Sequence, residues 1–200
     1  MEQKKKYLLV LKNTKYKKEK KMEFEILYAI KNLHNPILDK VMVAITSLGN
    51  AGLIWIAVAV FLLFIKKTRK CGILMLISMC LGLVLGNGIL KNLIARDRPC
   101  WIDTNIPLLI PNPLDFSFPS GHTLASFEAA VMIFLHNKKW GSISFILAIL
   151  ISFSRMYLFV HFPTDILGGI VLGTLISLTV YYGYEKIKNR KQNVEKQVQE

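Results

Sequence analysis

Residues 71–90 read CGILMLISMCLGLVLGNGIL, a run of twenty positions without one charged side chain. An α-helix rises about 1.5 Å per residue, so a run of this length crosses the roughly 30 Å hydrocarbon core of a bilayer. Polar and apolar residues do not alternate along it, as they would in a strand of a membrane barrel. The run therefore predicts a transmembrane helix and a membrane protein.

Four further runs are also mainly apolar, and one of them, Thr123–Leu135, needs its flanks to reach the length of a span. They are Ala51–Ile65, Thr123–Leu135, Ser142–Val160 and Ile166–Tyr184. In lipid a chain must satisfy its own backbone groups, which favours helices here as well. Three glycines of the last run, Gly168, Gly169 and Gly173, predict close contact with a neighbouring helix.

The segment Phe24–Leu48 is also long enough to cross, but polar residues cluster in its middle. Two arrangements stay open: a kinked crossing against the bundle, or an interfacial amphipathic helix followed by a short insertion. The crossing is favoured because it keeps the basic segments of the chain on one side of the membrane. The predicted fold is then an all-α, polytopic membrane bundle of about six transmembrane helices.

The distribution of charge orients this bundle. The net charge is +13 although 52% of the residues are hydrophobic and the mean hydropathy is +0.39. Twenty of the 26 Lys and Arg residues lie in segments 1–22, 66–70, 138–139 and 186–196. Positive loops mark the cytoplasmic side, so six crossings would place both termini there and segments 96–119 and 159–165 outside. No basic, aromatic face exists apart from these loops, which argues against a nucleic-acid partner.

Composition divides the chain into three parts. Residues 1–21 form a basic extension, predicted to be cytoplasmic, that precedes Met22. Residues 22–186 form the membrane-embedded domain, and residues 187–200 form a polar tail that is also predicted to be cytoplasmic. No further domain is expected from this length.

The first polar cluster lies at the predicted outer ends of the helices and contains Lys91 and Arg98, which Pro99 follows. The two cations are seven positions apart, or two helical turns, so they face the same way. Arg binds phosphate oxygens in a bidentate manner and Lys supplies a point charge. The pair is interpreted as an anion clamp, and the alternative is a basic cap that reaches toward the membrane interface.

The second cluster, Pro119-Ser120-Gly121-His122, immediately precedes a predicted helix. Ser120 is a favourable N-cap residue, and Gly121 allows a ligand to approach the backbone. Free N–H groups at the start of a helix attract anions. The cluster predicts a second anion-binding element with a histidine beside it; a capped turn with an interfacial histidine is the alternative.

The third cluster holds Arg155, His161 and Asp165 near the end of an apolar run. His161 and Asp165 are four positions apart, close enough for the carboxylate to orient the imidazole if the segment turns helically. A cation such as Arg155 is costly at the end of an apolar helix unless an anion meets it. The alternative is a structural histidine–aspartate pair.

Together the three clusters contain the groups that phosphoryl transfer through a phosphohistidine requires. They supply a nucleophile, an acid for the leaving group and cations that stabilise charge. No metal ligand cluster and no cofactor are expected. Asp97, Asp103 and Asp115 lie in the same region, but Asp97 stands between two arginines and is more simply a charge partner.

The spacing of these residues resembles the three motifs of the type 2 phosphatidic acid phosphatase superfamily over roughly residues 22–186. The resemblance implies a metal-independent lipid phosphatase with a vanadium-haloperoxidase-like core in a bacterial-type cell membrane. It implies a catalytic set of His161 as nucleophile, Asp165 as its orienting residue and His122 as the acid. The phosphate-binding residues it implies are Lys91, Arg98, Ser120, Gly121 and Arg155.

The start of the domain, from Met22, also resembles bacterial undecaprenyl pyrophosphate phosphatases of this superfamily. The predicted substrate is therefore a lipid phosphate or pyrophosphate, most simply undecaprenyl pyrophosphate, handled on the outer face. Phosphatidylglycerophosphate and phosphatidate stay open, as do a binder or transporter of anionic lipids and, less favoured, a haloperoxidase. Glu128 is interpreted as structural, and the oligomeric state is not predicted.

Overall fold

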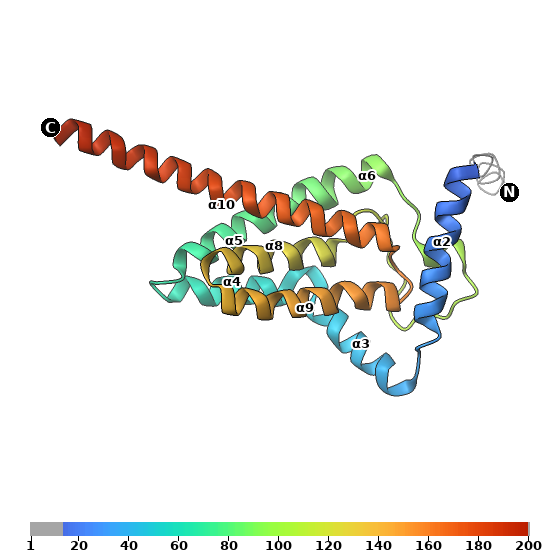
Figure 1. The fold of residues 1–200 in the computed structure, drawn as a ribbon. Helices are drawn as coiled ribbons and strands as arrows, with labels where there is room; N and C mark the ends of the chain where they lie inside the picture. Colours follow the sequence, from blue (N-terminus) through green and yellow to red (C-terminus); the bar gives the residue numbers. More distant parts are fainter. Residues whose placement is uncertain (1–13, 200) are drawn as a thin grey trace.

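Residues 14–199 are described by the structure, a computed structural model, and every regular element in this range is a helix (Figure 1). The longer helices are α2 (Thr14–Lys31), α3 (Pro36–Leu48), α4 (Leu53–Phe64), α5 (Arg69–Gly82), α8 (Gly121–His136), α9 (Lys138–Tyr157) and α10 (Pro163–Gln199). The shorter ones are the 3₁₀ turn η1 (Asn50–Gly52), the π-helix η2 (Leu83–Leu90), α6 (Lys91–Ile94) and α7 (Pro99–Ile102). The predicted all-α class is confirmed.

Helix α8 lies at the centre of the bundle, where it packs against α5, α9 and α10 (Figure 1). The surrounding helices turn apolar side chains outward. Phe61 of α4, Ile146 of α9 and Val171 of α10 are 63%, 61% and 57% exposed. An apolar exterior of this extent suits a lipid environment rather than water, as expected for a multi-pass membrane protein.

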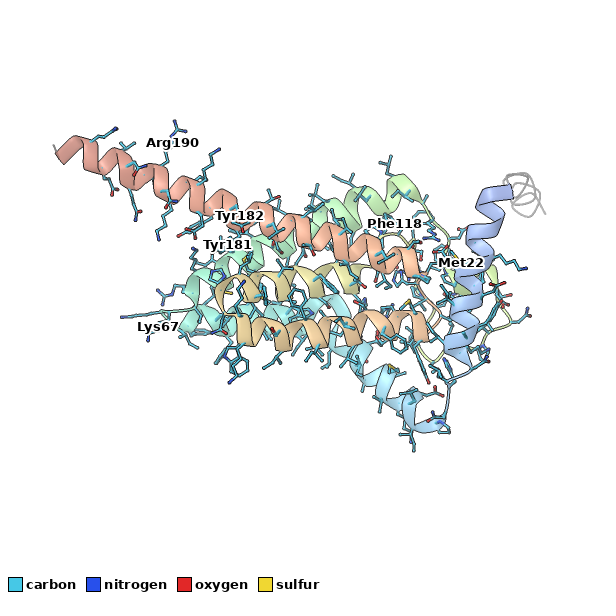
Figure 2. All side chains as sticks on the ribbon, viewed as in Figure 1. Met22, Lys67, Phe118, Tyr181, Tyr182 and Arg190 are labelled. Carbon is cyan, nitrogen blue, oxygen red and sulfur yellow. The ribbon has the colours of Figure 1, made fainter. Side chains whose placement is uncertain are left out.

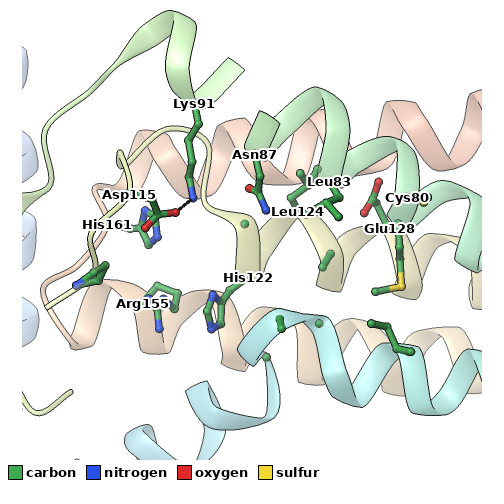
Figure 3. Close-up of a pocket in the computed structure, with 18 of the residues that line it drawn as sticks. Cys80, Leu83, Asn87, Lys91, Asp115, His122, Leu124, Glu128, Arg155 and His161 are labelled. Carbon is green, nitrogen blue, oxygen red and sulfur yellow. Dashed lines mark hydrogen bonds and ion pairs between the residues drawn. The ribbon is translucent and has the colours of Figure 1, made fainter. Parts of the chain in front are cut away.

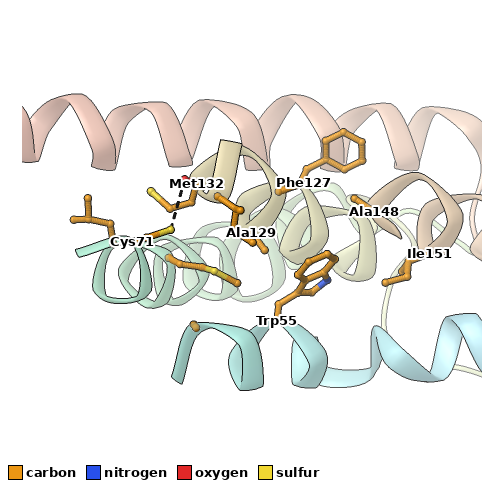
Figure 4. Close-up of a cluster of buried hydrophobic side chains, with 12 residues drawn as sticks. Trp55, Cys71, Phe127, Ala129, Met132, Ala148 and Ile151 are labelled. Carbon is orange, nitrogen blue, oxygen red and sulfur yellow. Dashed lines mark hydrogen bonds between the residues drawn. The ribbon is translucent and has the colours of Figure 1, made fainter. Parts of the chain in front are cut away.

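The interior combines apolar packing with hydrogen bonds between helices. Figure 4 shows Trp55 of α4 packed among buried side chains that include Ile151 of α9. The Trp55 indole N–H donates to the Ser126 hydroxyl of α8 at 2.9 Å. The hydroxyls of Ser78 on α5 and Ser177 on α10 lie 3.1 Å apart. Such polar contacts hold membrane helices together where lipid provides no hydrophobic driving force.

The predicted close contact of the glycine-containing helix is confirmed. A Cβ atom added at Gly173 of α10 would lie 2.7 Å from the Leu124 carbonyl oxygen of α8. One added at Gly169 would lie 2.9 Å from the Thr123 Cβ. The missing side chains therefore let α10 lie directly against the backbone of α8.

Within the described residues, fewer spans are found than the six predicted. Three helical segments are long and apolar enough to cross a membrane: Arg69–Ile102, Lys138–Tyr157 and Pro163–Glu195. A fourth span arises if Pro36–Leu48 and Asn50–Phe64, which meet at a 45° bend, count as one. Helix α8 has only 16 residues, so it reaches a span's length only with its flanks.

The kinked crossing favoured for Phe24–Leu48 is not among the candidate spans of the described residues, because this segment divides between two helices. The chain breaks before Pro36, and the Asn35 side chain accepts hydrogen bonds from the N–H groups of Ile37 and Leu38 to cap a new helix. Pro36 stands at the first helical position, where its missing N–H costs nothing. Helix α2 instead lies across one end of the bundle (Figure 1), which matches the interfacial alternative.

This arrangement also separates the two ends of the described chain. Helix α2 lies at the end of the bundle where α10 begins, whereas the last turn of α10 extends beyond the opposite end (Figure 1). Thr14 and Gln199, the ends of the described part of the chain, therefore lie at opposite ends of the bundle. Residues 1–13 of the predicted basic extension lie outside the described residues, and residues 187–199 continue α10 without a break.

Candidate active site

A cavity of about 540 Å³ opens between α4, α5, α8 and α9 near the end of the bundle that α2 covers. Figure 3 shows the side chains that line it, charged at one end and apolar at the other. The predicted site residues on its wall are Lys91, Arg98, Gly121, His122, Arg155 and His161. Ser120 and Asp165 lie just behind this wall and are fully buried. Three clusters far apart in the sequence thus meet at one place.

His161 lies in the turn between α9 and α10 and is 1% exposed. Its Nε2 atom is 3.0 Å from Nη1 of Arg98. A guanidinium only donates hydrogen bonds, so Nε2 accepts and carries no proton. Burial, followed by the charge of Arg98 and other cations, lowers the pKa of His161 well below its usual value. The imidazole is therefore neutral, and the electron pair of Nε2 accepts the hydrogen bond from Arg98 beside the cavity.

Asp165 is held by the start of α10. Its Oδ2 atom accepts from the backbone N–H of Phe162 at 2.7 Å and from the Ser117 hydroxyl. The contact with Phe162 is the reciprocal half of a capping box, in which the third helical residue reaches back to the N-cap. Oδ2 is 3.6 Å from His161 Nδ1, close but longer than a hydrogen bond.

Lys91 and Arg98 share one carboxylate. Asp115, in the loop before α8, pairs with the ammonium of Lys91 and accepts from Nη2 of Arg98 at 2.7 Å. The pKa of Asp115 is lowered to about 2, because its pairing with the two cations outweighs burial. Arg98 also donates to the carbonyl of Val160 at 2.8 Å. Lys91 and Arg98 thus lie close enough together to bind one anion between them, and the carboxylate of Asp115 is in that position.

Arg155 differs from the other two cations because it has no ion pair among the described residues. It is 4% exposed at the end of α9 and donates from Nη1 to the Thr46 hydroxyl at 2.7 Å. Its Nε atom is buried without a hydrogen-bond partner in the described part of the chain. A buried guanidinium with an unused donor beside a cavity is suited to an incoming anion.

The start of α8 forms the remaining wall. Ser120 is the N-cap, as predicted, and its hydroxyl accepts from the Thr123 N–H. His122 Nε2 is 3.0 Å from the Asn50 side-chain oxygen, so this nitrogen carries the proton. A Cβ atom at Gly49 would lie 2.7 Å from the His122 ring, which explains the absence of a side chain there. The Nε2 proton of His122 is thus donated to Asn50, and burial, followed by the charges of Arg155 and other cations, lowers the pKa of His122 to about 3.

The apolar end of the cavity contains Glu128, which is 1% exposed. Its Oε1 atom has no hydrogen-bond partner among the described residues, whereas its backbone carbonyl accepts from Ser177 of α10. A Cβ atom at Gly82 would overlap the carboxyl group. The contact with α10 is thus made by the backbone of Glu128, and its carboxyl group lies apart from Lys91, Arg155 and His161 (Figure 3).

Residues 71–189 match the PAP2 superfamily. The chain belongs to this superfamily. It is 40% identical to an undecaprenyl-diphosphatase of Sulfolobus acidocaldarius over 141 residues, which covers 70% of this chain and 68% of the relative. This PAP2 protein is accordingly a membrane lipid phosphatase, a hydrolase.

Solved structures agree with this assignment. The crystal structure of the PAP2-type phosphatidylglycerolphosphate phosphatase of Bacillus subtilis superposes with a TM-score of 0.70 at 31% identity, and 90% of each chain is covered. A bacterial vanadium-dependent iodoperoxidase gives a TM-score of 0.65 at 16% identity over 80% of this chain and 48% of that chain. The latter shares the fold alone, which confirms the vanadium-haloperoxidase-like core.

Several polar residues of this PAP2 protein's site were not predicted. Thr46, Asn50 and Ser117 contact Arg155, His122 and Asp165, respectively. Asn87 lines the cavity from the π-helix η2, with its oxygen unpartnered among the described residues. Of these four residues, only Asn87 could have been noticed in the sequence, where it is a polar break in an apolar run. It lies in a π-helical turn, and such turns inside longer helices frequently occur at functional sites.

Asp115 gives a direct prediction about anion affinity. Replacing Asp115 by asparagine removes the charge that competes with an incoming phosphate while the side-chain shape stays the same. Asp115→Asn is expected to lower the inhibition constant of inorganic phosphate several-fold, a modest gain because the Asp115 side chain is 56% exposed.

The matched control is Asp103→Asn in the same loop, whose carboxylate accepts from Tyr28 at 2.7 Å and does not contact the clamp. Its inhibition constant should equal that of the native protein. Equal constants for Asp115→Asn and the native protein would show that Asp115 does not compete with phosphate.

Proposed function

We propose that this protein removes the terminal phosphate of undecaprenyl diphosphate, through a phosphohistidine on His161, and so produces undecaprenyl phosphate. The observation that carries the mechanism is the unprotonated Nε2 of His161, which faces a cavity lined by Lys91, Arg98 and Arg155. The similarity to the Sulfolobus acidocaldarius undecaprenyl-diphosphatase supports the choice of lipid.

In the first step of the proposed reaction, Nε2 of His161 forms a bond to the terminal phosphorus, and the bond from phosphorus to the bridging oxygen breaks. His122 donates a proton to that oxygen as the lipid phosphate leaves. Water then attacks phosphorus, gives a proton to His122 and releases inorganic phosphate from His161. The three cations and the N–H groups at the start of α8 stabilise the charge on the transferred group.

The apolar part of the cavity supports a substrate with a hydrocarbon chain next to its phosphate. Ile56, Leu76, Met79, Leu83 and Leu124 line this part, on the side away from His161. A cavity of about 540 Å³ is large enough for a phosphate group and the first part of a lipid chain. The mainly apolar wall suits a polyprenyl chain.

A second candidate substrate is phosphatidylglycerophosphate, because a solved structure of that specificity covers 90% of this chain. Phosphate release in detergent micelles, measured for both lipids and for phosphatidate, distinguishes them. We expect the highest kcat/KM for undecaprenyl diphosphate, with the rate unchanged by a chelator. Binding without phosphate release would contradict the proposal, and a higher kcat/KM for phosphatidylglycerophosphate would favour the second candidate.

We further propose that the site faces the outside of the cell. Figure 2 shows Lys67 and Arg190 at the end of the molecule opposite Phe118, which precedes the site. The basic loops 66–70 and 138–139 and the basic tail favour a cytoplasmic position for that opposite end. Helix α2, with its lysines, lies at the site end, so the charge rule alone does not decide the orientation.

Single cysteines at two exposed positions test this orientation. On a background without Cys71, Cys80 and Cys100, a membrane-impermeant thiol reagent applied to intact cells is expected to label Thr104→Cys and not Lys67→Cys. Labelling after cell lysis controls for reactivity at both positions. Labelling of position 67 alone in intact cells would show that the site faces the cytoplasm.

A further inference from the structure

Behind His161, polar side chains from three segments of the chain form one continuous set of contacts. Arg96 lies in the loop between α6 and α7 and connects Glu23 of α2 with Asp165 of α10. Its Nη1 atom donates to Asp165 Oδ1 at 2.6 Å and also to the Thr164 hydroxyl. Its Nη2 atom donates to the carboxylate of Glu23.

Glu23 is 7% exposed, whereas the other charged residues between positions 20 and 31 of α2 are half-buried or exposed. Its Oε1 atom accepts from the Thr164 N–H at 3.3 Å, in the first turn of α10, and from the Thr164 hydroxyl. Its neighbour Glu25 is exposed and lies 3.8 Å from Lys21. Burying a carboxylate is costly unless a cation and hydrogen bonds compensate, so the contacts of Glu23 are specific to its position.

The guanidinium of Arg96 is held on its other face as well. Its centre lies 4.4 Å from the ring centroid of Phe162, the residue that follows His161. Such stacking, together with two donor groups that face two different carboxylates, fixes the plane of the guanidinium. A lysine could not reproduce this geometry, since it has one compact charge in place of a planar fork.

We propose that Arg96 is a positioning residue for the His161–Asp165 pair and that Glu23 fixes Arg96, which makes helix α2 part of the active-site support. The inference rests on the proposed phosphohistidine mechanism. Arg96 takes up Oδ1 of Asp165, which leaves Oδ2 turned toward Ser117 and His161. Neither Arg96 nor Glu23 touches the cavity, so both act through Asp165.

The charges around Asp165 determine the sign of the expected effects. Among the described residues, Arg96 is the cation that contacts the carboxylate; Arg98 is further away, against His161. Lys20 of α2 also interacts electrostatically with Arg96, Glu23 and Asp97. Turnover requires ionised Asp165 and neutral His161. Removing the Arg96 charge disfavours both forms, and removing the Glu23 charge favours both.

Substitution of Arg96 and substitution of Glu23 by glutamine should therefore move the acid limb of the pH profile of kcat in opposite directions. Arg96→Gln is expected to lower kcat about 10- to 100-fold with little change in KM and to move the limb up by about one pH unit. Glu23→Gln is expected to lower kcat only a few-fold and to move the limb to lower pH. Arg96→Lys should return the limb toward that of the native protein and recover only part of kcat.

Glu25→Gln, two residues further along α2 and exposed, is the matched control and should leave the pH profile of kcat unchanged. Native kcat and an unmoved limb in Arg96→Gln would overturn the proposal. So would limbs that move in the same direction in Arg96→Gln and Glu23→Gln, since general loosening of the fold predicts that outcome.

A second measurement tests the positioning role of Arg96 and Glu23 without using any substrate. Diethyl pyrocarbonate modifies neutral imidazole, and mass spectrometry locates the modified residue without any turnover. The pH midpoint for modification of His161 should rise in Arg96→Gln and fall in Glu23→Gln, with His122 as the internal reference. Unchanged midpoints would overturn the positioning role, whereas absence of lipid phosphate hydrolysis in the native protein would overturn only the proposed function.

Discussion

Replacing His161 by alanine is expected to abolish turnover, with kcat lower by about 10⁴-fold or more, because the proposed mechanism forms its covalent bond to phosphorus at Nε2 of this residue. Covalent labelling by a substrate that carries ³²P in its terminal phosphate should disappear as well. Rapid acid-free quenching followed by gel autoradiography measures this labelling.

His136→Gln is the matched control for the loss of an imidazole. His136 ends α8 at the opposite end from His122, bonds to the Met132 carbonyl at 2.9 Å and does not line the cavity. It should retain both turnover and labelling. Radioactivity on His161→Ala protein, or native turnover by it, would show that another residue is the nucleophile.

The environment of His161 also predicts the shape of the pH dependence. Burial and the nearby cations lower the pKa of His161, so the neutral form persists as the pH falls below the usual pKa of histidine. A bound phosphate adds negative charge, which raises this pKa again. The acid limb of kcat should therefore lie at higher pH than that of kcat/KM, after correction for ionisation of the substrate.

Arg155→Ala is expected to lower kcat about 100-fold or more, since this cation lines the cavity and forms no ion pair with any of the described residues. Arg155→Lys should recover little of this loss, because an ammonium group cannot replace the planar guanidinium. Arg155 is a cleaner test than Arg98, whose removal would also free Asp115 and the Val160 carbonyl.

Lys139→Ala, at the exposed opposite end of the bundle, controls for the loss of a positive charge and should have native kcat. Phosphate release under saturating substrate measures all three variants. A kcat of Arg155→Ala within a few-fold of the native value would remove this residue from the phosphate site.

Local sequence patterns were sufficient to predict the helices of the bundle, but not the path of the segment before Ala51. The apolar runs of α5, α9 and α10 appear where they were predicted, because an uninterrupted apolar helix has few alternatives in lipid. The segment before Ala51 divides its polar and apolar residues evenly. Its path depends on contacts of α2 with the ends of α9 and α10, which have no counterpart in local spacing.

For the site, motif spacing predicted which residues meet, and the tertiary structure decided how each is used. Lys91, Arg98, His122, Arg155 and His161 all line one cavity, as their residue types suggested. The contact of Asp115 with the clamp depends on a loop, whose path is set by packing rather than by periodicity.

The sequence by itself determined the membrane class, the helices of the bundle and the residues able to handle phosphate, since these follow from hydropathy and side-chain chemistry. Only the tertiary structure decided that α2 lies across the catalytic end and that Arg96 joins Glu23 to Asp165. Residues 23 and 165 are separated by 142 positions. A contact between residues so far apart in the sequence depends on how whole helices pack, so the local sequence around either residue does not predict it.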